Sequence, residues 1–364
     1  MARIIKVRLA ERSYEINIAV GLLDKLGDLT RAAIGDKERN LIIVSNPTVY
    51  ALYGKRVERA FKQAGFHTQK FLMPDGERFK SLKTAESLYK FLIEQRVERS
   101  DVIVALGGGV VGDLAGFVAA TYLRGIKFIQ IPTTLIAQID SSIGGKTGVN
   151  HQLGKNLIGA FHQPSLVVID SLTLRTLPPR EIQAGLQEAI KYGVIKDRKL
   201  FHFIAKNMLT FKSGDDAAFE HLIARSCEIK ARVVERDEHE GNLRRILNFG
   251  HTVGHALEAV THYRRFLHGE AVGLGMRAAA RIAERAGLLS RKDAQAINDA
   301  VLSVGQLPST NTLALDAIME AMQRDKKAES GRLAFVLPIA IGRVVIKSDL
   351  PLPLIKSAIK ETLL

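Results

Sequence analysis

Residues 248–270 hold the side chains of this chain that are best suited to metal chemistry. His251 and His255 are four residues apart, so on a helix both imidazoles lie on one face. A loop that returned His268 to that face would complete a nitrogen-rich site of the kind that Zn²⁺ prefers. The alternative is that these histidines are polar surface or capping residues. The glycines that flank them indicate close approach of backbones, which favours the metal site.

A glycine-rich turn earlier in the chain is suited to binding phosphate. The apolar run Val102–Leu106 leads into Gly107–Gly112, which matches G-x-G-x-x-G between a strand and a helix. Backbone N–H groups and the helix N-terminus at such a turn bind a pyrophosphate. No acidic residue ends the next strand, where Thr133 and Thr134 stand instead. A tight structural turn therefore stays open as the alternative to a nucleotide site.

A second glycine-rich segment, residues 140–150, has Gly-Gly-Lys-Thr at its centre. The full P-loop pattern fails, because Asp140 stands where the first glycine of that pattern is required. The segment therefore argues against an NTPase. Lys146, Lys155 and Asn156 still place hydrogen-bond donors beside glycines, as an anion site requires.

The spacing of apolar residues indicates which elements must position these groups. Before Pro178, short apolar runs alternate with helical patterns, which predicts a largely parallel sheet covered on both faces. The predicted strands are Ile4–Leu9 and Tyr14–Ile18, as a hairpin, then Leu41–Val44, Phe71–Met73, Val102–Leu106, Phe128–Ile131 and Leu166–Ile169, with helices over 49–63 and 84–95. After Pro179 the helical segments are 180–196, 216–236, 250–262, 269–287, 291–304 and 312–323, followed by β-like runs at 332–337 and 343–347. We predict an α/β domain over residues 1–178 and an α-helical domain over 179–364.

The composition is that of an ordinary globular protein with a strongly basic balance. The chain has 364 residues, of which 46% are hydrophobic and 25% charged, and its formal net charge is +14. No run of five basic residues and no recognition module for nucleic acid occurs, so the charge favours an anionic small substrate over nucleic acid. Cys227 is the only cysteine, and we expect no signal peptide and no membrane span. These features predict a cytoplasmic protein.

Several motifs occur in one order along the chain and together resemble a known family. They are Gly107–Asp113, Gly144–Asn150, Gly154–Asn156, Phe161–Pro164, Gly185–Gly193, Asn248–His255, Leu267–Val272 and Asp325–Lys327. As an ordered set, within about Asn46 to Lys347, they resemble the 3-dehydroquinate synthases, which are sugar phosphate cyclases. The resemblance implies a Rossmann-like NAD-binding domain followed by an all-helical domain that holds zinc.

The resemblance also implies a lyase reaction in the shikimate pathway. The substrate would be 3-deoxy-D-arabino-heptulosonate 7-phosphate, a phosphorylated keto acid, and the products 3-dehydroquinate and phosphate. The enzyme would oxidise C5 with NAD, eliminate phosphate, reduce C5, open the ring and close it again by an intramolecular aldol reaction. Two alternatives stay open. One is a related cyclase that acts on a sedoheptulose or glucose phosphate, and the other is a metal-dependent alcohol dehydrogenase of related architecture.

By this resemblance, the metal ligands are Glu188, His251 and His268, with Zn²⁺ or alternatively Co²⁺ as the ion. One carboxylate and two imidazoles leave coordination positions open for substrate, as a catalytic zinc requires. His255, which the spacing alone paired with His251, takes a role in substrate binding and proton transfer instead. Lys191 would share the helix face of Glu188, where a simple salt bridge is the alternative.

The resemblance assigns further residues to the two ends of the substrate. Lys230 and Arg244 would bind the carboxylate, and Asn248 would contact the ring. Cyclases whose substrates lack a carboxylate would not need this set. The phosphate would be bound by Lys146, Asn156, His255 and one of Lys326 and Lys327, between which the sequence does not choose. In a homodimer, Arg124 would reach the phosphate of the neighbouring subunit.

The NAD contacts that the resemblance implies fall in the first domain. They are Asn46 and Thr48; Asp75, Gly76, Glu77, Arg78, Phe79 and Lys80; Gly109, Val110, Val111, Gly112 and Asp113; and Thr133, Thr134, Asp140, Lys146, Lys155, Thr173, Leu174, Arg175 and Thr176. Asp140 would lie near the nicotinamide. Without the other motifs, Glu77 and Lys80 would be interpreted as an i,i+3 surface pair.

Two positions depart from the family pattern. Asn242 stands where the family has glycine, and because asparagine tolerates positive φ, we expect the turn that places Arg244 to survive. Gln187 stands where the family has alanine, and we expect it to add a hydrogen bond beside the metal site.

Overall fold

The computed structural model describes residues 2–35, 39–327 and 333–364, and of residues 325–327 only the backbone. By its backbone contacts the chain groups into two compact units. The first unit is Met1–Leu177 with Phe219–His239, and the second is Pro178–Ala218 with Glu240–Leu364. Most of the long helix α9 (Asp216–Arg236) therefore belongs to the first unit. The predicted domain division after residue 178 remains a prediction.

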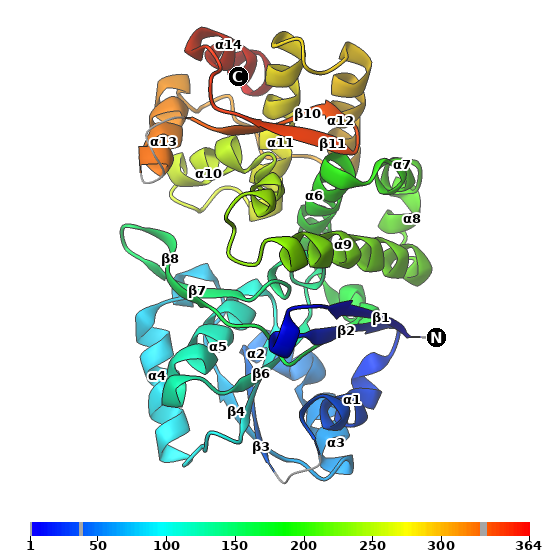
Figure 1. Cartoon of the computed structure of the whole chain (residues 1–364), viewed down its shortest axis with the longest axis vertical. Helices are drawn as coiled ribbons and strands as arrows, with labels where there is room; N and C mark the ends of the chain where they lie inside the picture. Colours follow the sequence, from blue (N-terminus) through cyan, green and yellow to red (C-terminus); the bar gives the residue numbers. More distant parts are fainter. Residues whose placement is uncertain (1, 36–38, 328–332) are drawn as a thin grey trace. The chain divides into compact units, whose positions relative to one another are not determined.

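A seven-stranded sheet forms the centre of the first unit, in the order β1-β2-β9-β6-β5-β3-β4 (Figure 1). Its strands are β1 (Arg3–Val7), β2 (Tyr14–Ala19), β3 (Asn40–Ser45), β4 (His67–Leu72), β5 (Val102–Gly107), β6 (Lys127–Pro132) and β9 (Leu166–Asp170). β1 and β2 pair antiparallel, and every other pair in this sheet is parallel. The predicted hairpin and the predicted parallel sheet are both confirmed, although β4 begins earlier than predicted.

Alternate side chains of the strands enter two separate cores. In β3, Leu41 and Ile43 pack on one face, in a cluster with residues of α1 (Leu26–Ile34) and α3 (Lys55–Gln63). Ile42 and Val44 pack on the other face, with residues of α4 (Leu82–Glu94) and α5 (Gly109–Thr121). Since side chains in a strand alternate between faces, these all-apolar runs mark a sheet that is buried on both sides. Figure 1 shows α4 and α5 on the opposite side of the sheet from α1 and α3.

The strand order reverses between β3 and β5, which are neighbours in the sheet. From β3 the chain proceeds outward to β4, while from β5 it proceeds the other way to β6. The ends of the two strands are joined by a hydrogen bond of 2.7 Å from Ser45 Oγ to the Leu106 carbonyl. In open α/β sheets, ligands bind outside the carboxyl ends of the strands at such a switch point. The glycine-rich turn after β5 therefore lies where this fold binds nucleotides.

Helices make up most of the second unit. They are α6 (Pro179–Lys196), α7 (Arg198–Lys206), α8 (Met208–Lys212), α10 (His251–Val260), α11 (His268–Arg285), α12 (Arg291–Val304), α13 (Leu315–Lys327) and α14 (Leu352–Leu363). α11 packs against α6, α10, α12 and α14 and is therefore buried around most of its circumference. The β-like runs that the sequence predicted form the hairpin β10 (Phe335–Ala340) and β11 (Arg343–Lys347). The predicted fold class is confirmed.

Two groups of elements were not predicted. The second glycine-rich segment forms an antiparallel hairpin of β7 (Lys146–His151) and β8 (Gly154–Phe161), and α1, α7, α8 and α14 are helices that the periodicity did not indicate. The predicted helix over 49–63 is an irregular run of α2 (Pro47–Val49), a π-helical turn over Tyr50–Gly54 and α3. Among the described residues, no helix has the length and apolar character that crossing a bilayer demands.

Candidate functional site

Three helices of the second unit bring the predicted metal ligands together. Glu188 lies in α6, His251 is the first residue of α10, and His268 is the first residue of α11. Glu188 Oε1 is 3.8 Å from His251 Nε2 and 3.6 Å from His268 Nε2. A set of ligand atoms from the three side chains lies within 4.8 Å of one another. These distances between ligand atoms are somewhat longer than those around a bound metal ion, so a small inward movement of the side chains would coordinate an ion.

Glycines allow these helices to approach closely enough. A Cβ atom at Gly269 would lie 2.0 Å from the Ala184 carbonyl oxygen of α6, so only glycine permits this contact of α11 with α6. A Cβ atom at Gly275 would lie 1.9 Å from the carbonyl oxygen of Gly250, which precedes α10. The expectation of close backbone approach at the histidine stretch is therefore confirmed.

The second nitrogen of each histidine is held by an oxygen. His251 Nδ1 is 3.1 Å from the Phe249 carbonyl, and His268 Nδ1 is 3.2 Å from Glu258 Oε2. Because both oxygens are acceptors, each Nδ1 donates a hydrogen bond to its oxygen, and each Nε2 faces Glu188. No role for Glu258 was predicted from the sequence. Its place seven residues after His251, on the same helix face, was the signal that could have found it.

The environment of the Glu188 carboxylate indicates whether these residues suit a cation. It is 1% exposed, and neither of its oxygens accepts a hydrogen bond from any described residue. The ammonium group of Lys191, one helical turn on, forms an ion pair with Oε2. An ionised carboxylate buried in this way is stabilised by positive charge, and Oε1, which faces the two imidazoles, accepts no hydrogen bond. The three side chains therefore fit a divalent cation.

The pKa values of the two imidazoles are shifted in opposite directions. Burial lowers the pKa of His251 well below its ordinary value, and the positive charge of Lys191 lowers it further. Burial is the largest single effect on His268 and lowers its pKa, but the hydrogen bond with Glu258 and the negative charges of Glu258 and Glu188 together outweigh burial, so the pKa of His268 is raised. A neutral His251 is in the form that binds a metal ion.

His255 belongs to the same cluster of rings. Its ring centroid is 5.3 Å from that of His251 and 5.9 Å from that of His268, and its side chain is exposed. His255, Glu258 and His268 form a second group whose ligand atoms lie within 4.8 Å of one another. Because Glu258 already holds His268 Nδ1, the geometry favours the Glu188 group over the His255 group for the ion.

In the first unit, the glycine-rich turn leads directly from β5 into α5. α5 begins at Gly109 after Gly108, and no side chain caps its first turn. A Cβ atom at Gly109 would lie 2.9 Å from Ser141 Oγ, a buried hydroxyl without a hydrogen-bond partner among the described residues. The turn is thus a narrow cradle at a helix N-terminus that no side chain caps, which fits the pyrophosphate of NAD.

A polar network lies beside this turn and joins several predicted NAD residues. Lys80, which is 4% exposed, donates hydrogen bonds to Asp113 Oδ2 and Asn156 Oδ1. Burial raises the pKa of Asp113, and the charge of Lys80 opposes that shift. Glu77 accepts a hydrogen bond of 2.8 Å from Asn150 and lies 3.9 Å from Lys155 Nζ. Glu77 and Lys80 are therefore not merely a surface pair.

Other predicted NAD residues have partners within the first unit. Asn46 Oδ1 accepts from the Val49 amide as the N-cap of α2, and Thr48 Oγ1 donates to Asp75 Oδ2 at 2.7 Å. The buried Thr173 hydroxyl donates to the Asp170 carbonyl at 2.8 Å. The remaining residues lie at the 3₁₀ turns 77–79 and 171–176, at Gly76 with φ +109°, and after β6, where the Thr133 amide donates to the Gly107 carbonyl.

The predicted substrate residues lie in both units. In the first unit, Lys230 Nζ is 2.8 Å from Asp140 Oδ1, Lys146 begins β7, and Arg124 lies in an exposed turn where it and Leu123 both have positive φ. In the second unit, Arg244 and Asn248 belong to the 3₁₀ turn Leu243–Asn248, and Arg244 is 2% exposed. The side chains of Lys326 and Lys327 lie outside the described residues.

The two departing positions have different outcomes, and only the expectation for Gln187 is wrong. The 3₁₀ turn that carries Arg244 is present, although Asn242 has φ −156° and Glu240 supplies the positive φ before it. The amide of Gln187 does not reach the metal cluster, because its Nε2 donates to the Val301 carbonyl of α12 at 3.0 Å. Gln187 therefore contributes to packing between α6 and α12.

The comparisons with known proteins agree on one family. Residues 70–184 match the family model described as 3-dehydroquinate synthase N-terminal, and residues 185–328 match 3-dehydroquinate synthase C-terminal. A 3-dehydroquinate synthase from Gloeobacter violaceus is 51% identical and covers 95% of this chain and 96% of its own length.

Solved structures of related cyclases have the same fold. The 2-epi-5-epi-valiolone synthase of Streptomyces hygroscopicus, solved with NAD⁺ and Zn²⁺ bound, is 28% identical, with a TM-score of 0.88 and 98% of each chain covered. A 2-deoxy-scyllo-inosose synthase, complexed with carbaglucose-6-phosphate, NAD⁺ and Co²⁺, is 27% identical, with a TM-score of 0.88, covering 99% of this chain and 100% of its own.

Proposed function

Because the chain belongs to the 3-dehydroquinate synthase family, we propose that it converts 3-deoxy-D-arabino-heptulosonate 7-phosphate to 3-dehydroquinate and phosphate. The observation that carries this proposal is a sequence match over nearly the whole chain, joined to the convergence of Glu188, His251 and His268 from three helices. As in the family reaction, the protein is a lyase of the shikimate pathway. We place it in the cytoplasm.

Phosphate release tests this assignment most directly. The purified protein is incubated with the heptulosonate phosphate, NAD and Zn²⁺, and free phosphate is measured over time. Sedoheptulose 7-phosphate and glucose 6-phosphate serve as controls, because they lack the carboxylate that Lys230 and Arg244 are proposed to bind. Rapid release from a control, with none from the heptulosonate phosphate, would assign the chain to another cyclase activity.

Different residues of the chain would bind the cation and the anionic groups of the substrate. When bound, a divalent cation would polarise the hydroxyl group that is oxidised, and NAD would take up and return the hydride. We propose that Glu188, His251 and His268 hold the cation, while Lys191 balances the charge of Glu188. The remaining task is to position and stabilise a highly anionic substrate, for which cationic side chains are suited.

The substrate's two anionic ends would each meet a separate set of donors. Lys230, Arg244 and Asn248 would bind the carboxylate and the ring. Lys146, Asn156, His255 and Lys326 or Lys327 would bind the phosphate. The exposed His255, whose ring lies next to that of His268, would transfer a proton to or from the substrate.

For NAD we propose the cradle at Gly109–Asp113, the segment Asp75–Lys80 and the residues at the strand ends. Support comes from the switch point between β3 and β5 and from the network of Lys80, Asp113 and Asn156. Thr133, Thr134, Asp140, Lys146, Lys155, Thr173, Leu174, Arg175 and Thr176, with Asn46 and Thr48, complete the proposed contacts.

The exchange of Glu258 for glutamine should weaken metal binding about ten- to a hundredfold, since outer partners of metal-bound histidines contribute on that scale. The carboxylate holds His268 Nδ1 at 3.2 Å, and an amide in its place no longer supplies a charged acceptor. Zinc affinity is measured by competition with a chelator. Glu284→Gln, on the same helix as His268 but paired with Arg281, is the control. Equal zinc affinity in Glu258→Gln and the control would remove Glu258 from this role.

We further propose a homodimer in which Arg124 completes the partner's phosphate site. Support comes from the exposed Arg124 and from the positive φ of both Leu123 and Arg124, a backbone strain that is common at functional turns. Arg124→Ala chains and Lys146→Ala chains should each be nearly inactive.

A mixture of the two inactive proteins should regain activity. In a hybrid dimer one site receives both intact residues, so random exchange predicts about a quarter of the wild-type rate. The rate is measured after the subunits are dissociated and reassembled. A mixture that stays inactive, although hybrid dimers are detected, would place Arg124 in its own subunit's site or outside the site.

A further inference from the structure

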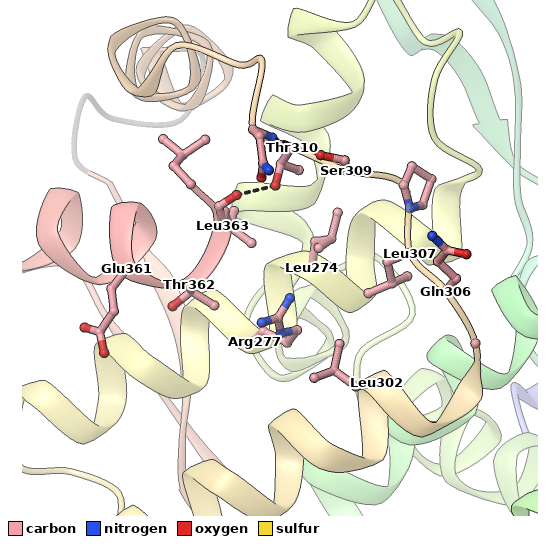
Figure 2. A pocket seen from close by; sticks show the side chains of 14 residues that line it. Leu274, Arg277, Leu302, Gln306, Leu307, Ser309, Thr310, Glu361, Thr362 and Leu363 are labelled. Carbon is pink, nitrogen blue, oxygen red and sulfur yellow. Dashed lines mark hydrogen bonds between the residues drawn. The ribbon is translucent and has the colours of Figure 1, made fainter.

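A cavity of about 550 Å³ lies in the second unit, apart from every residue assigned to metal, NAD or substrate. Figure 2 shows it between α11, which carries Leu274 and Arg277, Leu302 of α12, the segment after α12, and the end of α14. Its volume is in the range of pockets that bind small molecules. We propose that this cavity is a binding site for a small carboxylate with an apolar body, recognised by Arg277.

Arg277 supplies the charge for this recognition. Its Nε donates to Asn298 Oδ1 at 2.8 Å, which fixes one edge of the guanidinium group. Within the part of the chain that the structure describes, Arg277 makes no ion pair, and its two terminal nitrogens have no hydrogen-bond partner. Those nitrogens form the planar fork that binds a carboxylate with two parallel hydrogen bonds.

The carboxylate that lines the cavity does not serve Arg277. Glu361 is 3.1 Å from Arg281 NH2 and also forms an ion pair with Arg285, so its charge is balanced elsewhere. Burial lowers the pKa of Arg277, yet a guanidinium group stays charged at neutral pH. A half-buried cation without a protein counter-charge is stabilised by an anion from solution, which the net charge of +14 also attracts.

The other walls determine the rest of the ligand. Leu274, Leu302, Leu307 and Pro308 contribute apolar surface, and Leu302 is 45% exposed although it is a leucine. Ser309 and Asn311 add polar groups at the same cavity. A charged head group at Arg277 and an apolar body against the leucines therefore satisfy both kinds of wall, whereas inorganic phosphate would leave the leucines exposed.

Benzoate is a suitable probe, and benzamide is its uncharged counterpart. Binding to the intact protein, with NAD and Zn²⁺ present, is measured by isothermal titration and by saturation-transfer NMR. We expect benzoate to bind the wild type, and benzamide to bind about tenfold more weakly or worse, because a charge-assisted hydrogen bond contributes on that scale. Arg277→Gln should weaken benzoate binding by a similar factor without loss of phosphate release.

Three variants keep the result unambiguous. Leu302→Asp places a carboxylate near Arg277 at a position that is already 45% exposed, so it should also abolish benzoate binding. Arg291→Gln removes the same charge at an exposed position of α12 and should leave benzoate binding unchanged. Arg244→Gln tests whether the signal comes from the proposed substrate site, and it too should leave benzoate binding intact.

Benzoate affinity that is equal in the wild type, Arg277→Gln and Leu302→Asp would overturn the proposal. So would loss of binding in Arg244→Gln alone, equal affinity for benzoate and benzamide, or no detectable benzoate binding at millimolar concentration. Thermal unfolding of each variant checks that it is folded. If Arg277→Gln does not fold, benzoate binding by Leu302→Asp tests the proposal instead. None of these outcomes depends on the proposed catalytic function, which phosphate release tests separately.

Discussion

Replacing His268 with alanine should remove the bound divalent cation and the catalytic activity together. His268 Nε2 and His251 Nε2 both face Glu188 Oε1, so the loss of one imidazole leaves too few ligands for a catalytic site. A metal ion that polarises a reacting oxygen lowers the barrier by several kcal/mol, which corresponds to about a thousandfold in rate. We therefore expect phosphate release to fall by about that factor or more. Metal content is measured by elemental analysis, and activity by phosphate release.

The substitution is a fair test because it should not disturb the helix. His268 is the first residue of α11, and alanine is a good helix former at that position. His202→Ala, an exposed histidine of α7 outside the cluster, is the matched control and should retain both metal and activity. Chelation of the wild type should likewise abolish activity, and Zn²⁺ or Co²⁺ should restore it. Full activity in a His268→Ala protein that holds no metal would exclude this metal site.

The strands of the seven-stranded sheet could be predicted because their sequence signals are local. β3, β5 and β9 contain uninterrupted apolar runs, and the run in β6 is broken only by Gln130; such runs form strands that are buried on both faces. In β7 and β8 the apolar residues do not alternate regularly with polar ones, so no period of two marks these segments as strands. α14 was missed because Pro351 and Pro353 suggest a loop, whereas a proline in the first turn is compatible with a helix.

The metal cluster marks the limit of reasoning from spacing. The interval between His251 and His255 placed two imidazoles on one face correctly, and their ring centroids are 5.3 Å apart. Spacing within one helix carries no information about the helix that packs opposite, so it did not indicate Glu188 of α6. The choice of Glu188 came from the family resemblance. The structure adds Glu258, whose contact with His268 depends on tertiary packing of α10 against α11.

Gln187 and Asn242 show the same limit for single substitutions. Each was interpreted from the residue that the family has at that position and from its sequence neighbours. The side chain of Gln187 forms a hydrogen bond with α12, against which α6 packs. Asn242 adopts an ordinary extended φ, and Glu240 has the left-handed φ instead. Local chemistry predicted what these side chains are able to do, and tertiary contacts determine what they do.

Phosphate release should continue for many turnovers with NAD far below the amount of substrate. In the proposed cycle a hydride leaves C5 and later returns to the same carbon, so NAD is regenerated within each turnover. No NADH absorbance should accumulate in the steady state. A dehydrogenase of related architecture would instead release NADH in each turnover, and fold alone does not separate the two activities.

Substitution of Lys80 tests whether the protein retains NAD during the cycle. It binds Asp113 and Asn156 beside the glycine-rich turn and is 4% exposed, so Lys80→Met leaves the Asp113 carboxylate without its cation. We expect the NAD concentration for half-maximal rate to rise about ten- to a hundredfold, the scale of a lost charge-assisted hydrogen bond. Lys83→Met, at an exposed position of the neighbouring helix α4, is the control and should leave that concentration unchanged.

The decisive measurement follows phosphate and NADH in the same reaction. Retained NAD gives phosphate in large excess over NADH, because loss of NADH before the second hydride transfer would strand an oxidised intermediate. If Lys80→Met loosens the cofactor, NADH should appear in that variant while the wild type shows none. NADH that forms in step with substrate loss in the wild type would make the protein a dehydrogenase. That result would overturn the proposed reaction even though the metal cluster and the fold would stand.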